Sequence, residues 1–314
     1  MKRLLPILTV VFLFLSASCA QLAPSGTIKI GLLPIIESLP FWVADRDGYF
    51  GDQNLKVELV LFVSAVERDA ALQAKAIDGE LNDLISAALL NKDQETIKIT
   101  RKTYQATPRL PMISIVVPAT SKIASVNDLR GAKVGISRNS VIEYVLDEIL
   151  AANGLKPTDI EKVEVSKIPL RVEMLMNGQL AAAVLPEPFT ALAQKQGAKV
   201  LAHDGADGIG ESVLSFRREV LRDKAQFVDR FLVAYEQAVN DINSKPEDYR
   251  ALLVEKGKIP DLIAKTFPVP EIPTASVPSQ SSIQRSMNWM MRAGLLSRSL
   301  SYDQMVDGTH LPRR

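Results

Sequence analysis

The chain alternates short β-rich runs with helical patterns, and this alternation limits the folds open to it. Strand-like runs cover residues 27–34, 57–62, 132–137, 163–168 and 181–186. Helix-like patterns between them cover residues 40–50, 65–76, 141–153, 170–178 and 188–197. Strands that alternate with helices predict an α/β fold with largely parallel sheets and helices on their faces.

The pattern changes beyond residue 210. A strand there leads into a long helical segment at about 225–243, and a last helix is expected at about 282–296. The segment between them, 267–278, is proline-rich, and we expect it to be irregular and to lie at the surface. The mature length suggests one to two domains with ample core.

The N-terminus predicts export. Lys2 and Arg3 precede an apolar run at residues 4–15, and small residues follow at 16–18. This order is typical of a secretory signal peptide, which we assign to residues 1–18. The run is shorter than the ~20 apolar residues that a membrane-spanning helix needs.

Cys19, the only cysteine of the chain, follows directly. The site resembles the lipobox of bacterial lipoproteins, in which such a cysteine is acylated and becomes the new N-terminus. Lipoproteins prefer Leu three places before the cysteine, whereas this chain has Ser16, so ordinary cleavage after Ser18 stays open. We expect residues 19–26 to link a lipid anchor to a domain held in the periplasm or on the outer face of the cell membrane.

Charge and motifs exclude several classes of protein. Removing residues 1–18 changes 37 basic and 36 acidic residues to 35 and 36, and no basic run remains. We therefore expect no nucleic-acid partner. The chain has only two histidines and neither a GxSxG nor a GxxxxGK motif. Hence we predict no cofactor, no metal and no catalytic residues.

Several segments in a fixed order carry a resemblance to a known family. They are IKIGLLP, PFWVADRDGYF, LKVELVLF, SAVERDAALQAKAIDGEL, SVNDLRGAKVGIS and MLMNGQLAAAVLPEPF. Over about residues 27–310 the chain resembles solute-binding proteins of ABC importers, of the nitrate/sulfonate/taurine and thiamine-precursor (NMT1/THI5-like) type.

The resemblance implies the type II periplasmic-binding-protein fold, in which a hinge joins two α/β lobes and a ligand cleft lies between them. By similarity, lobe 1 would comprise residues 27–117 plus 207–314, and lobe 2 residues 118–206. It further implies a monomer that delivers a small-molecule solute to the permease and ATPase of an importer.

Open parallel sheets bind ligands beyond the carboxyl ends of their strands, and this rule nominates the binding residues. The candidates are Glu37, Ser38, Phe41, Trp42, Ser64, Asn82, Asp83, Ser137, Arg138, Asn139, Ser140 and Glu187. Other roles stay open for some of them. The serines and Asp83 can cap helices, the aromatic residues can belong to the core, and Arg138 can be a solvated loop charge.

The candidate residues suggest an organic solute rather than a small ion. Acidic side chains suit an amine or amidine, Arg138 suits an anionic group, and the aromatic residues suit a ring. A sulfonate-, taurine- or pyrimidine-like molecule fits these features. The alternative is an enzyme of the same fold that acts on a chorismate-derived or pyrimidine metabolite, and the export leader favours the binding protein.

Overall fold

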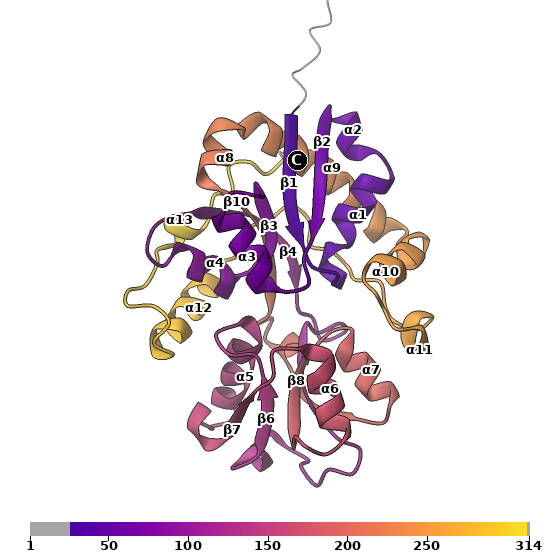
Figure 1. The fold of residues 1–314 in the computed structure, drawn as a ribbon, viewed down its shortest axis with the longest axis vertical. Helices are drawn as coiled ribbons and strands as arrows, with labels where there is room; N and C mark the ends of the chain where they lie inside the picture. Colours follow the sequence, from indigo (N-terminus) through magenta and orange to yellow (C-terminus); the bar gives the residue numbers. More distant parts are fainter. Residues whose placement is uncertain (1–25, 313–314) are drawn as a thin grey trace, which may run out of the picture.

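The computed structural model describes residues 26–312 as two lobes, each built on a five-stranded sheet with helices on its faces (Figure 1). The first sheet has the order β2 (Leu55–Leu61), β1 (Gly26–Leu32), β3 (Gly79–Asp83), β10 (Glu211–Arg217) and β4 (Ile97–Gln105). The second has the order β7 (Glu161–Glu164), β6 (Lys133–Ile136), β8 (Ala182–Pro186), β5 (Ile113–Val117) and β9 (Lys199–His203). The predicted α/β architecture is confirmed.

The helices cover both sheets. Those of lobe 1 are α1 (Leu39–Arg46), α2 (Tyr49–Asp52), α3 (Ala65–Gln73), α4 (Leu84–Asn91), α8 (Arg218–Asp223), α9 (Ala225–Ser244), α10 (Arg250–Lys256), α11 (Asp261–Ala264), α12 (Gln280–Arg292) and α13 (Tyr302–Met305). Those of lobe 2 are α5 (Val141–Ala152), α6 (Ile168–Met176) and α7 (Phe189–Lys195).

No helix within residues 26–312 is long and apolar enough to span a membrane. The predicted signal peptide and Cys19 lie outside the described residues.

One strand in each sheet runs against its neighbours. β1 pairs in parallel with β2 and β3, and β6 pairs in parallel with β7 and β8. β10 and β5 pair antiparallel with theirs. Each of these two strands is the first after the chain crosses from the other lobe. It therefore starts at the edge of the sheet where the parallel strands end.

The chain crosses between the lobes at residues 106–112 and 204–210. The first crossing comes earlier than the sequence predicted, because residues 113–117 were assigned to lobe 1. These residues form β5, which hydrogen-bonds to β8 and β9 in the middle of the second sheet. Lobe 1 thus comprises residues 26–105 and 211–312, and lobe 2 comprises residues 113–203.

Aromatic packing joins α1 to the long helix α9 in the core of lobe 1. The ring of Phe41 lies 4.8 Å from that of Tyr235 and 6.2 Å from that of Phe231. Phe41 is completely buried there, and Trp42 is 5% exposed. The ring of Phe41 thus packs in the core, and its predicted contact with a ligand stays a prediction.

A buried arginine fixes the proline-rich segment onto this core. The guanidinium of Arg101 in β4 lies 4.5 Å from the ring centre of Tyr235 and pairs with Glu236 of α9. Its Nη2 donates to the carbonyl oxygen of Pro273 at 2.7 Å. The irregular backbone predicted for this region is thereby held in place by a side chain.

The lobes also touch where α12 of lobe 1 meets α5 of lobe 2. Trp289 donates from Nε1 to Asp147 Oδ2 at 3.0 Å, and its ring lies 5.4 Å from that of Tyr144. At the edge of this contact, Arg292 pairs with Glu148 at 2.9 Å. A separation of the lobes at this side must break a buried hydrogen bond to a carboxylate.

We expect the Trp289→Phe variant to favour the open arrangement of the lobes. It keeps an aromatic ring but removes the donor, so the closed state should lose roughly 1.5–3 kcal/mol. Small-angle scattering of the ligand-free protein should then give a larger radius of gyration than the wild type. The control is Trp42→Phe, inside lobe 1, which should leave the radius unchanged. Equal radii for all three proteins would contradict the prediction.

Candidate functional site

Three buried carboxylates gather where the lobes face each other. The parallel strands of lobe 1 end toward lobe 2 (Figure 1). Glu37 follows β1, Glu187 follows β8, and Asp204 follows β9. None of the three residues is more than 8% exposed. Side chains from both lobes and from the second crossing thus meet in one region.

Asp204 and Glu187 lie on either side of the Met112 backbone. Oδ1 of Asp204 accepts the N–H groups of Met112 and Ile113 at 3.0 and 3.2 Å. The N–H of Glu187 donates to the Met112 carbonyl oxygen at 3.1 Å, and its side chain accepts the N–H of Ala191. Met112 in the first crossing is thus hydrogen-bonded both to Asp204 in the second crossing and to Glu187 after β8.

Glu37 approaches the same place from lobe 1. Its Oε1 accepts the hydroxyl of Ser212 at 3.5 Å, and that hydroxyl also lies 3.5 Å from the sulfur of Met112. Among residues 26–312, neither Oε2 of Glu37 nor Oδ2 of Asp204 has a hydrogen-bond partner, although both atoms are buried. Two acceptor oxygens therefore remain for a donor that a ligand can supply.

The electrostatic environment keeps these carboxyls partly protonated near neutral pH. Burial raises the pKa of Glu37, Glu187 and Asp204 to about 7 each. Repulsion adds to the effect, because Asp204 raises the pKa of Glu37 and both raise that of Glu187. Burial and the same three carboxylates raise the pKa of Tyr104, whose hydroxyl donates to the Leu110 carbonyl oxygen.

This arrangement suits a nitrogen ligand better than a metal ion. Carboxylates accept hydrogen bonds from ammonium, amidinium and amino groups, and such charge-assisted bonds are strong. Within the described part of the chain, no group of three or more His, Cys, Asp or Glu residues has a geometry that could hold a metal ion.

Most of the other lobe 1 candidates have structural partners. The Ser38 hydroxyl donates to the Leu33 carbonyl oxygen at 2.7 Å, and Asn82 bonds to Glu80 and Ser215 inside the sheet. Ser64 caps α3 by accepting an N–H at 3.3 Å. Asp83 caps α4, where one carboxylate oxygen accepts two backbone N–H groups and the other accepts a hydroxyl.

The lobe 2 candidates at the start of α5 also bind mainly to their own lobe. Ser140 caps the helix, and the Asn139 N–H donates to Glu143 at 2.7 Å. The half-exposed Arg138 donates to the Lys162 carbonyl oxygen at 3.0 Å. Ser137 differs from these residues, because its hydroxyl accepts a hydrogen bond from the buried Arg171 at 3.2 Å. Its role in solute binding, like that of Glu37 and Glu187, stays a prediction.

Sequence reasoning missed Asp204, Met112, Ser212 and Arg171. Asp204 lies directly after β9, at the start of the second crossing. The available signal was an acidic residue directly after a strand, the same signal that nominated Glu187. The other three residues reach the site through pairings that are distant in sequence, and no local pattern marks them.

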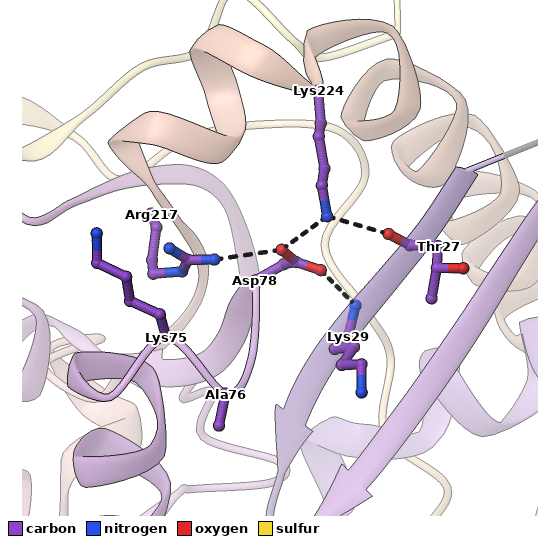
Figure 2. A pocket seen from close by; sticks show the side chains of 7 residues that line it. All are labelled: Thr27, Lys29, Lys75, Ala76, Asp78, Arg217 and Lys224. Atoms are coloured by element: carbon purple, nitrogen blue, oxygen red, sulfur yellow. Dashed lines mark hydrogen bonds and ion pairs between the residues drawn. The ribbon is translucent and has the colours of Figure 1, made fainter.

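A separate polar pocket of about 480 Å³ lies at the opposite edge of the lobe 1 sheet (Figure 2). It is lined by Thr27, Lys29, Lys75, Ala76, Asp78, Arg217 and Lys224. Asp78 accepts from Lys224 Nζ at 3.0 Å and lies 3.4 Å from Arg217 Nη2. The two other lysines pair with glutamates at 2.9 and 3.0 Å. Because the cations have carboxylate partners, we interpret this pocket as a structural ion-pair network.

Comparison with known proteins identifies the family. The profile of the family described as NMT1/THI5 like matches residues 36–249, which is more than half of the chain. The chain belongs to this family.

Two relatives match about two thirds of the chain. A Haemophilus influenzae protein whose name assigns it to thiamine biosynthesis is 28% identical over an alignment of 217 residues, which covers 66% of this chain and 65% of that protein. The riboflavin-binding protein RibY of Chloroflexus aurantiacus is 21% identical over 71% of this chain and 63% of its own. The matched region thus spans slightly less than two thirds of each relative.

Solved structures show that the fold is that of periplasmic binding proteins. The aliphatic sulphonate binding protein SsuA of Escherichia coli superposes with a TM-score of 0.76 over 92% of this chain and 96% of its own. The two sequences are 19% identical, so this likeness concerns the fold alone.

We expect Glu37→Gln to stabilise the protein at pH 8 and to change little at pH 5. Because the pKa of Glu37 rises from 4.5 to about 7 on folding, its contribution to stability is full below pH 4.5 and is lost as the pH rises through 7. The neutral amide avoids that loss, and the gain at pH 8 should be roughly 1–3 kcal/mol. Urea unfolding at both pH values measures it.

The control for this prediction is Asp128→Asn. Backbone N–H groups of Ala124 and Ser125 lower the pKa of exposed Asp128, so the loss of its charge should bring no gain at pH 8. An equal effect of Glu37→Gln at both pH values would show that burial does not hold a proton on this carboxyl.

Proposed function

We propose that the protein is the extracytoplasmic substrate-binding component of an ABC importer. It captures a small organic solute between its lobes and delivers the solute to a permease and its ATPase. The observation that carries this proposal is the set of carboxylates from both lobes and a crossing. Two of them have a buried oxygen that no group within residues 26–312 hydrogen-bonds. A ligand that donates to these oxygens would hold the lobes together.

The acidic site favours a solute with N–H donors. A pyrimidine-like molecule with an amino group, or a taurine-like molecule with an ammonium group, offers such donors. A simple alkyl sulfonate offers none, so it would leave the carboxylate oxygens without a donor. The names of the relatives, which refer to thiamine biosynthesis and riboflavin binding, agree with a nitrogen heterocycle.

The proposed location is outside the cytoplasm. The predicted signal peptide at residues 1–18 would direct export, and acylation of Cys19 would anchor a monomeric domain to the membrane surface. The fold, which the chain shares with a periplasmic protein, supports this location.

An enzyme of the same fold, acting on a chorismate-derived or pyrimidine metabolite, is the alternative. One observation favours the enzyme: the pKa values of Glu37 and Glu187 are about 7, which suits a general acid or base. The export leader favours the binding protein. We therefore propose that the cleft holds its solute without changing it.

We expect protein expressed from Ala20 onward to release about one unaltered metabolite per chain when it is denatured. Mass spectrometry of the released molecule would name the solute. The same molecule, added back and recovered unchanged after prolonged incubation, would support binding without turnover. Recovery of an altered molecule would favour the enzyme, and a cleft that takes up no metabolite from a cell extract would contradict both readings.

We also expect Glu187→Ala to weaken the affinity for that solute at least tenfold. One charge-assisted hydrogen bond is worth roughly 1.5–3 kcal/mol, which corresponds to this factor. The matched control is Asp83→Ala, which removes a helix cap and should cost about 1 kcal/mol of folding free energy. Its affinity should stay within about twofold of the wild type. Isothermal titration calorimetry measures both, and equal losses would contradict the assignment of the site.

A further inference from the structure

The two lobes repeat one structural motif, which places an arginine over a glycine. A Cβ on Gly31 of β1 would lie 3.1 Å from Arg68 Cγ, and a Cβ on Gly135 of β6 would lie 3.2 Å from Arg171 Cγ. The Cβ on Gly31 would also lie 2.5 Å from Cδ1 of Ile77, and the Cβ on Gly135 would lie 2.5 Å from Cδ1 of Leu180. Both of these residues come nine places after the arginine of their lobe. Arg68 in α3 and Arg171 in α6 are therefore equivalent.

Arg68 has carboxylate partners in its own lobe. Its Nη2 lies 2.6 Å from Asp69 Oδ1, its Nε lies 3.5 Å from Glu80 Oε2, and its Nη1 donates to the Leu81 carbonyl oxygen at 2.7 Å. Only 3% of its side chain is exposed. The cost of burying this charge is offset by two anions and a carbonyl group.

Arg171 lacks both of these carboxylates. Asp69 directly follows Arg68, whereas Val172 directly follows Arg171. Glu80 comes twelve places after Arg68, whereas Ala183 comes twelve places after Arg171. Arg171 is completely buried, and its Nη1 donates to the Ser137 hydroxyl. Within residues 26–312, neither its Nε nor its Nη2 has a hydrogen-bond partner. Burial lowers the pKa of this guanidinium to about 10.

The charge of Glu164 at the end of β7 partly opposes this lowering of the Arg171 pKa, but within residues 26–312 no carboxylate forms an ion pair with Arg171. A buried cation without a paired anion is costly, so its position in the fold matters. Ser137 follows β6 and is half-buried at the carboxyl end of that strand. β6 lies next to β8, the strand that ends at Glu187. The Ser137 oxygen accepts from Arg171, which leaves its own hydroxyl hydrogen available to donate to another acceptor.

We propose that Ser137, backed by the charge of Arg171, binds an anionic group of the solute. The solute is then dipolar: its N–H donors face Glu37, Glu187 and Asp204, and its oxyanion accepts from the Ser137 hydroxyl. This inference rests on the proposed function and specifies its substrate class. Arg171 acts as a positioning residue, because it reaches the solute through Ser137.

The first test needs no ligand and compares Arg171→Met with Arg68→Met. Loss of the Arg171 charge, which has no ion-pair partner within the described residues, should leave the unfolding temperature of the free protein unchanged or raised. Loss of Arg68 should lower this temperature by several degrees, because it leaves Asp69 and Glu80 buried without a cation. Thermal unfolding measures both, and an equal decrease would show that Arg171 is as well compensated as Arg68.

The second test restores the missing carboxylate. Val172→Asp should pair with Arg171 as Asp69 pairs with Arg68, and should weaken sulfate binding at least tenfold without a loss of stability. The matched control is Leu170→Asp, which adds the same charge to an exposed position of α6 and should stay within about twofold of the wild type. Equilibrium dialysis with radioactive sulfate, up to about 10 mM, is the measurement.

The outcomes separate this inference from the proposed function. Wild-type protein that binds no sulfate, or Val172→Asp that binds it as well as the wild type, would overturn the anion site. If the wild type still releases a metabolite in that case, the proposed function stands and only the dipolar character falls. If the wild type captures no metabolite but its sulfate binding is lost in Val172→Asp, the anion site stands and the importer role falls.

Discussion

The bonds from Asp204 to the backbone of Met112 and Ile113 are the interaction on which the arrangement of the lobes depends. They fix the second crossing to the first, so the strands that enter both sheets start from one common point. Gly210 makes this possible, because a Cβ there would lie 2.1 Å from Asp204 Oδ2. Within residues 26–312 the other oxygen of this carboxylate has no hydrogen-bond partner, so in the proposed binding mode the residue that joins the crossings would also contact the solute.

The site is acidic where the crossings lie and basic on one side of lobe 2. The two lobes have the same strand order and the same arginine position, but lobe 1 neutralises its arginine internally. Lobe 2 has apolar residues at the equivalent places. The two lobes thus differ at the positions of Val172 and Ala183, where lobe 2 has no carboxylate to form an ion pair with its arginine.

The architecture was predictable from the sequence because each element has a local signal. Alternating runs identified the strands, Ser64 and Ser140 marked helix starts, and Glu187 was nominated by its place after a strand. The carboxylate cluster was not predictable, since Asp204 and Glu37 are brought together by crossings that link distant segments. The same limit explains the error at residues 113–117, whose apolar run fits either lobe until the pairing with β8 is known. Phe41 illustrates a further limit: its position after the first strand suggested a ligand contact, whereas in the structure its ring packs against α9.

The Trp289 contact with lobe 2 has a consequence for how this protein can diversify. Trp289 lies outside the region that the family profile matches, residues 36–249, whereas its partners Tyr144 and Asp147 lie inside it. Substitutions in α12 can therefore alter the free-energy difference between the open and closed lobes while every residue that faces the solute stays the same. If the protein binds its solute as proposed, apparent affinity would depend on the fraction of molecules in the closed arrangement, and the C-terminal segment could adjust the working concentration range without a change in selectivity.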